Sequence, residues 1–125
     1  DIIPIIFYFG AIFWTLGYDT IYGYQDIKDD EIIGLKSTSI KFKGNEKKFL
    51  FICYALLLIL FLIGGYFMEF KNTYYFLMII PFLHLFFYQI KIFESKDSKS
   101  CLKVFKSNNI FGLIIFLNIL IAKNL

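Results

Sequence analysis

Arginine is absent from this chain, and histidine and cysteine are scarce. All 13 basic residues are lysines, there is one histidine, and the only thiols are those of Cys53 and Cys101. Two cysteines so far apart have no metal-binding spacing and give no reason to expect a disulfide, so we expect both to be structural. The lysines border apolar segments and do not alternate with exposed aromatic residues. The net charge of +3 is therefore no sign of nucleic-acid binding.

Charge is also missing from most of the chain's length. Hydrophobic residues make up 58% of it, aromatic residues 22% and charged residues only 18%, which is too apolar for a small soluble core. The run from Tyr54 to Phe67 has no charge and no polar face. A helix needs about 20 apolar residues to cross a bilayer, so we predict an all-α integral membrane protein with about four transmembrane helices. The predicted spans are Ile2 to Tyr18, Phe49 to Met68, Tyr74 to Phe93, and Leu102 or Ile110 to Ala122.

The first apolar segment has none of the features of a secretory signal. It lacks a basic start and a small-residue cleavage site. The chain begins at Asp1, without a methionine and directly before an apolar run. We therefore expect it to be part of a longer protein.

The lysines are distributed unevenly between the two sides of the predicted membrane. The positive-inside rule places lysine-rich connections in the cytoplasm, or on the equivalent side of an organelle membrane. Only Lys71 and Lys123 fall on the opposite side. The first and third connections hold the other lysines, which are Lys28, Lys36, Lys41, Lys43, Lys47 and Lys48, then Lys91, Lys96, Lys99, Lys103 and Lys106.

Acidic residues cluster in one segment, Asp19 to Thr38, which directly follows the first apolar run. No proline occurs between this run and Lys48, so the first helix is free to continue. With about 100° per residue, a continuous helix places Asp19, Tyr22, Asp26 and Asp30 on one stripe roughly 80° wide. We therefore expect these four side chains to lie on one face.

Carboxylates repeated on one helix face repel one another, and an ionised aspartate near a membrane core costs about 2.5 to 3.5 kcal/mol. A divalent cation offsets this repulsion, and Mg²⁺ binds one or two carboxylates together with phosphate oxygens. Asp29 and Glu31 lie off the stripe, and we interpret them as solvated surface charge. Lys36 follows as a candidate phosphate-binding charge, with a snorkelling juxtamembrane lysine as the equal alternative.

Other polar residues in the spans favour structural interpretations. His84 and Asn118 are predicted to form interhelical hydrogen bonds. Asn108 and Asn109 lie near the start of the last span, where lining a site and capping a helix are equally good interpretations.

Three segments resemble one known family. YDTIYGYQDIKDDEIIGLKST, from Tyr18 to Thr38, resembles the second aspartate-rich motif of the UbiA superfamily of intramembrane prenyltransferases. CLKVFKSNNIFGLIIF, from Cys101 to Phe116, resembles the last loop and helix of the branch that prenylates 4-hydroxybenzoate for ubiquinone. FFYQIKI, from Phe86 to Ile92, resembles the end of the preceding helix. The likeness covers essentially the whole chain.

The resemblance implies a bundle of nine transmembrane helices with two facing aspartate-rich motifs that bind Mg²⁺ and diphosphate. Asp26 and Asp30 match metal-binding carboxylates, Asp19 and Tyr22 match the opening of the motif, and Lys36 matches the basic residue after it. The implied reaction joins the prenyl group of a polyprenyl diphosphate to a small aromatic acceptor. The first motif, N-D-x-x-D, is absent from the sequence. Residues 1–125 therefore correspond to the C-terminal part of such a domain, and an N-terminal part is expected as partner.

Two alternatives stay open. One is another enzyme of the UbiA type, with a haem, menaquinone-type or other acceptor. The other is a non-catalytic membrane module, which the missing first motif suggests. For either enzyme we expect a bacterial or mitochondrial inner membrane, with the acidic motif on the cytoplasmic or matrix side.

Overall fold

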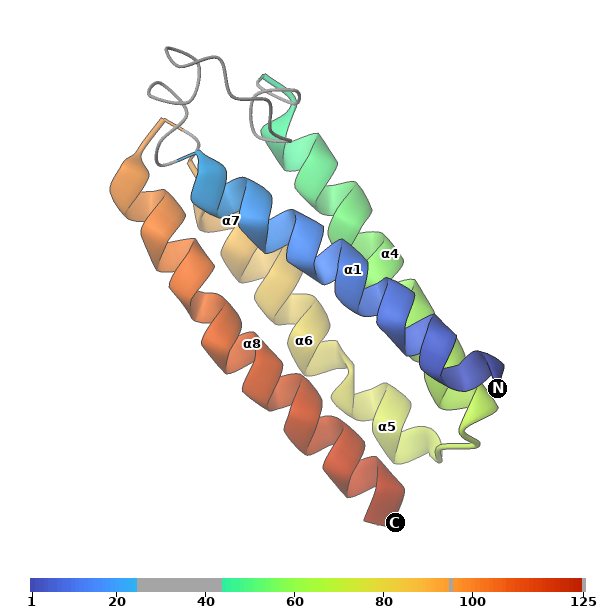
Figure 1. The fold of residues 1–125 in the computed structure, drawn as a ribbon. Coiled ribbons are helices and arrows are strands. Elements are labelled where there is room, and N and C mark those ends of the chain that lie inside the picture. Colours follow the sequence, from blue (N-terminus) through green and yellow to red (C-terminus); the bar gives the residue numbers. More distant parts are fainter. Residues whose placement is uncertain (25–43, 95, 125) are drawn as a thin grey trace.

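Four long helical stretches make up the described part of the chain (Figure 1). The computed structural model describes residues 1–24, 44–94 and 96–124. Each stretch is long and apolar enough to cross a membrane, which confirms the predicted all-α membrane architecture. The stretches are α1 (Ile2–Gly23), α4 (Glu46–Phe67), a segmented third one of α5 (Asn72–Leu77), α6 (Ile79–Leu83), η1 (His84–Gln89) and α7 (Ile90–Ile92), and α8 (Ser98–Asn124).

The helices extend beyond the predicted apolar runs. Asp1 is the N-cap of α1, and its carboxylate accepts a hydrogen bond from the Ile3 amide at 3.2 Å. The helix continues to Gly23. Asp19 and Tyr22 are therefore helical residues. α8 begins at Ser98, well before the predicted Leu102 or Ile110, because its first turns are amphipathic and bury Cys101 and Val104.

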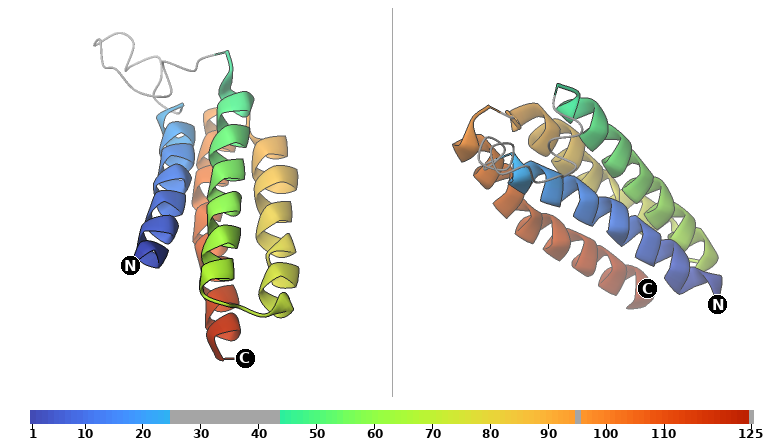
Figure 2. Two further views of the ribbon diagram at one scale, coloured as in Figure 1. Left: turned by 90° about the vertical axis from the view of Figure 1, so that its right-hand side faces the viewer. Right: turned by 45° about the horizontal axis from the view of Figure 1, so that its top comes forward.

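Consecutive stretches run in opposite directions, so each connection lies at one of two ends of the bundle (Figures 1 and 2). The end of α1, the start of α4 and the connection before α8 share one end. Both termini and the turn between α4 and α5 lie toward the other. Lys47, Lys48 and Lys99 lie at the first end, and Lys71 and Lys123 lie at the second. The described lysines thus separate by end as the sequence predicts.

Glycines bring α1 and α4 close together. A Cβ atom on Gly10 would lie 2.7 Å from the Phe61 ring, and one on Gly64 would lie 2.6 Å from the Phe7 ring. The Phe7 and Phe61 rings meet edge to face, with centroids 5.1 Å apart. Small residues at a crossing let two membrane helices approach closely. The α1–α4 contact is therefore built from reciprocal glycine–phenylalanine pairs.

The third stretch contains a wide π-helical turn from His84 to Gln89. Pro81, Leu85, Gln89 and Phe93 are all buried at steps of four residues. In an α-helix, three such steps would drift about 120° around the axis. The wider turn absorbs this drift, because each of its residues rotates the chain by less than in an α-helix. Gln89 therefore faces the interior of the bundle.

Candidate active site

Asp19 lies on a face of α1 that no described element covers. Its side chain is exposed, and it lines a hollow of about 330 Å³ together with Tyr8, Ile12 and Thr15. It forms no ion pair with another residue in the described ranges. This carboxylate is thus open to a ligand at the end of the bundle where the acidic segment begins.

Tyr22 lies one helical turn after Asp19 and faces α8. Its ring is 46% exposed, and its centroid lies 4.8 Å from that of Phe105. The α1 helix ends at Gly23, and the Tyr24 amide donates to the Ile21 carbonyl at 3.2 Å as the C-cap. Asp26, Asp30 and Lys36 lie outside the described residues, as do Asp29 and Glu31. The predicted stripe therefore stays a prediction beyond Tyr22.

A divalent metal suits the one predicted ligand that the structure describes. Asp19 offers hard carboxylate oxygens, which are the donors that Mg²⁺ prefers. Within residues 1–24, 44–94 and 96–124, no three metal-binding side chains come together. A metal at Asp19 would need ligands from other residues or from a bound diphosphate.

Tyr24, at the end of α1, is buried against Phe93. The two ring centroids lie 5.5 Å apart, and the Tyr24 hydroxyl has no hydrogen-bond partner in the described part of the chain. Burial raises the pKa of this phenol, and the charges of Glu46 and Cys101 add to the effect. A tyrosine phenol is already neutral at physiological pH, and burial strengthens this preference.

A buried polar cluster, absent from the sequence predictions, joins all four stretches. Its members are Trp14, Tyr54, Gln89 and Asn108. Asn108 Oδ1 accepts hydrogen bonds from Trp14 Nε1 at 2.8 Å and from Gln89 Nε2 at 3.1 Å. Gln89 Oε1 accepts from the Tyr54 hydroxyl at 2.6 Å. We call these four residues the polar cluster.

Asn108 is therefore neither a helix cap nor a surface residue, whereas Asn109, next to it, is exposed. The capping alternative is wrong, because α8 begins ten residues earlier, at Ser98, while the site-lining alternative stays a prediction. One signal for the cluster exists in the sequence. Gln89 is the one side-chain amide of the third predicted span, and Asn108 lies inside the last span if that span begins at Leu102, so both are polar groups that need partners.

The predicted interhelical hydrogen bonds of Asn118 are wrong within the described residues. Both polar atoms of its side chain are buried and have no partner there. The interhelical hydrogen bond predicted for His84 is confirmed, because its imidazole bonds to the backbone of Ser107 in α8. Its Nε2 atom is buried and has no partner among the described residues, and the ring packs between Tyr88 and Phe111, with centroid distances of 5.3 and 6.0 Å. The imidazole therefore links the third stretch to α8 while it packs beside aromatic rings.

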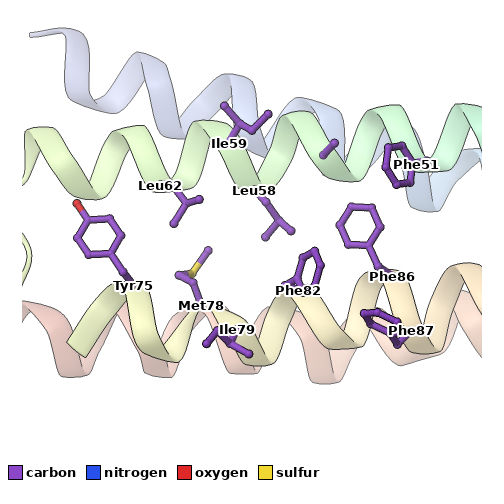
Figure 3. Close-up of a pocket in the computed structure, with 11 residues that line it drawn as sticks. Phe51, Leu58, Ile59, Leu62, Tyr75, Met78, Ile79, Phe82, Phe86 and Phe87 are labelled. Atoms are coloured by element: carbon purple, nitrogen blue, oxygen red, sulfur yellow. The ribbon is translucent and has the colours of Figure 1, made fainter. Parts of the chain in front are cut away.

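An apolar groove of about 540 Å³ runs between α4 and the third stretch (Figure 3). Figure 3 shows side chains from both helices pointing into it, with α1 behind α4. Asp19 belongs to the separate hollow on α1, and the two hollows share no lining residue. The groove lining includes Phe51, Leu58, Leu62, Met78, Phe82 and Phe86.

Four apolar helices and an exposed carboxylate at the end of one of them define an integral membrane protein with a candidate acidic site at one end of its bundle. The sequence profile of the UbiA prenyltransferase family matches residues 1–120. The chain belongs to this family. Prenyltransferases of the family generally depend on a divalent metal.

The chain is also similar to curated proteins. The chain is 36% identical over 107 residues to a protein named 4-hydroxybenzoate octaprenyltransferase from Histophilus somni, and this match covers 86% of the chain and 37% of the relative. It is 42% identical over 116 residues to a mitochondrial 4-hydroxybenzoate polyprenyltransferase from Bos taurus, which covers 92% of the chain and 31% of the relative. The chain thus spans about a third of the length of these relatives. No solved structure matches it.

Proposed function

We propose that this chain is part of an enzyme that transfers a polyprenyl group from a polyprenyl diphosphate to 4-hydroxybenzoate, as in ubiquinone biosynthesis. The family match over residues 1–120 carries the proposal, and the names of the relatives from Histophilus somni and Bos taurus support the acceptor. Because the chain spans about a third of these relatives, we propose that residues 1–125 act with an N-terminal part of the same protein.

In the proposed reaction, the C–O bond between the allylic carbon and the diphosphate breaks, and diphosphate leaves with the bonding electrons. The ring carbon next to the acceptor's hydroxyl attacks the allylic cation, forming a C–C bond. That carbon then loses its proton, which restores aromaticity. The phenol oxygen activates this position by donating electron density to the ring.

We propose that Asp19, Asp26 and Asp30 hold Mg²⁺, and that Tyr22 and Lys36 belong to the same site. The exposure of Asp19 supports this proposal, since its carboxylate is open to a ligand. Bound Mg²⁺ would neutralise the charge that develops on the departing diphosphate. Lys36 would add a point charge on a diphosphate oxygen.

The same site would lie on the cytoplasmic or matrix side of a bacterial or mitochondrial inner membrane. The separation of the described lysines supports this orientation, because Lys47, Lys48 and Lys99 share the end of the bundle at which α1 stops.

The test is prenylation of 4-hydroxybenzoate in membranes from cells that produce the complete gene product, supplied with one polyprenyl diphosphate. We expect the prenylated acid by mass spectrometry. Chelation of divalent ions should abolish its formation, and added Mg²⁺ should restore it. Membranes without the gene product control for endogenous activity.

Two results would overturn the proposal. Prenylation of a different aromatic acceptor or of haem, with none of 4-hydroxybenzoate, would indicate another enzyme of the family. No product with any acceptor would favour a non-catalytic membrane module.

A further inference from the structure

Asn108 is the centre of the polar cluster. Its Oδ1 atom accepts two hydrogen bonds, one from Trp14 of α1 and one from Gln89 of the third stretch. Its Nδ2 atom donates to the Phe105 carbonyl within α8, at 3.1 Å. The carboxamide is thus fixed by its own helix and in turn binds two neighbouring helical stretches. Tyr54 of α4 is tied in through Gln89.

The polar cluster is buried, so breaking one of its hydrogen bonds would leave a polar group without a partner. Tyr54 and Gln89 are 0% exposed and Asn108 is 8% exposed. In a membrane interior no water replaces a lost hydrogen-bond partner. If α1 rotated or slid against α8, the hydrogen bond from Trp14 Nε1 to Asn108 Oδ1 would break. The cluster therefore favours one rotation and one depth of α1.

The rotation of α1 decides where Asp19 points. Asp19 follows Trp14 by five residues, which is about 7.5 Å along the helix and about 140° around it. On the other side of Asp19, the Tyr22 ring packs on Phe105 of α8. α8 thus holds α1 at a residue before Asp19 and at a residue after it.

We propose that Asn108 is a positioning residue for the diphosphate site: through Trp14 it sets the rotation of α1 and hence the direction of the Asp19 carboxylate. This inference rests on the proposed prenyl transfer. Asn108 acts at a distance and does not touch the diphosphate. Asn118 provides a natural comparison, because it is also a buried asparagine of α8 but has no partner within the described residues.

The kinetic test compares Asn108→Leu with Asn118→Leu in the complete gene product. Both replace an amide by an apolar side chain of similar size on the same helix. For Asn108→Leu we expect the KM for polyprenyl diphosphate and the half-saturating Mg²⁺ concentration to rise about tenfold, with the KM for the aromatic acceptor unchanged, because a small misplacement of a binding group is costly. For Asn118→Leu we expect both values to stay within about twofold.

Trp14→Phe covers the case in which Asn108→Leu does not fold. It removes the N–H donor together with one ring of the indole and keeps a single aromatic ring against α8. We expect the same selective rise as in Asn108→Leu, because the hydrogen bond between α1 and Asn108 is lost in both variants.

A second readout does not need activity. Spin labels at the exposed positions Thr15 of α1 and Ile110 of α8, with Cys53 and Cys101 replaced by alanine, report the distance between the two helices. We expect one narrow distance distribution in the parent protein and in Asn118→Leu, and a broadened or shifted one in Asn108→Leu. If the parent protein has no prenyltransferase activity, the proposed function fails, while these distances still test whether Asn108 positions α1.

Unchanged distances in Asn108→Leu would overturn the inference. So would equal kinetic losses in Asn108→Leu and Asn118→Leu, which would indicate loss of general packing. A rise in the KM of the acceptor alone would also contradict a role at the diphosphate site.

Discussion

The two faces of α1 differ in their packing: one lies against other helices, and no described element packs over the other. The inner face carries Gly10, Trp14, Gly17 and Ile21 at helical spacing. The two glycines pack on α4, Trp14 is bonded to α8, and Ile21 is fully buried. The opposite face, about 170° around the helix, consists of Ile5, Tyr8, Ile12, Thr15 and Asp19, and no described element packs over the hollow there.

This difference separates residues that build the bundle from residues free to act. On the inner face the N–H of Trp14, its one polar side-chain group, has a partner, as membrane burial demands. On the outer face the Asp19 carboxylate is exposed, so it adds nothing to the packing of the bundle and is accessible to a ligand. A substitution on the inner face should therefore mainly lower the free energy of unfolding. A substitution at Asp19 should lower the prenylation rate and leave the free energy of unfolding unchanged.

The largest effect is expected for Asp19→Asn, which keeps the shape of the side chain and removes its charge. We expect prenylation to fall about 100-fold or more, as for the loss of one electrostatic partner in other active sites. The midpoint of thermal unfolding in detergent should not change. Ile5→Val, on the same face but outside the lining of the hollow, is the control and should leave both measurements unchanged. Wild-type rates in Asp19→Asn would remove this residue from the proposed site.

Gly17→Ala should act on the inner face. Its Cβ would lie 2.7 Å from the Tyr54 ring, which is buried and bonded to Gln89 and so has no room to move. Overpacking of this kind costs about 1 to 3 kcal/mol in the free energy of unfolding. Gly112→Ala is the control, since its Cβ would be 3.3 Å from the edge of Trp14. Equal unfolding free energies for the two variants would contradict the tight crossing at Gly17.

Tyr54→Phe removes one hydroxyl from the polar cluster. Hydrogen bonds between membrane helices contribute about 0.6 kcal/mol on average and up to about 1.7 kcal/mol, so we expect a loss in that range. Tyr24→Phe is the matched control, because the Tyr24 hydroxyl is buried without a partner among the described residues. Its removal should be neutral or stabilising. The same loss in both variants would mean that the Tyr54–Gln89 bond adds no stability.

The smallest effect is expected for Tyr8→Leu on the outer face. With 66% of its surface exposed, Tyr8 should change the free energy of unfolding by less than about 0.5 kcal/mol. Chemical unfolding of the complete gene product measures this value. A loss above about 1 kcal/mol would show that another part of the protein covers this face and would end the contrast between the two faces of α1.

Much of the fold follows from local sequence. The four spans are long apolar runs, and their number, order and lysine-marked ends are confirmed because hydrophobicity and charge act over short segments of chain. The position of Asp19 at a span's end was equally predictable. The helical stripe from Asp19 to Asp30 stays a prediction, since the structure describes Asp19 and Tyr22 and α1 ends at Gly23.

The polar cluster could not be predicted in the same way. Trp14 and Asn108 are 94 residues apart, and neither residue's neighbours indicate that the other is its partner. The π-helical turn that places Gln89 on the inner side of the bundle also could not be predicted from residue types alone. It forms where burial of Leu85, Gln89 and Phe93 on one side outweighs regular α-helical bonding.

The sequence by itself determined that this is a helical membrane protein, where its helices lie and which segment carries acid, because each of these depends on nearby residues and their transfer from water to lipid. Only the tertiary structure decided which buried amide is paired and which is not, and which face of α1 is covered. Those depend on contacts between distant helices, where a glycine or a wide helical turn moves a side chain by a few ångströms and so makes or removes a hydrogen bond.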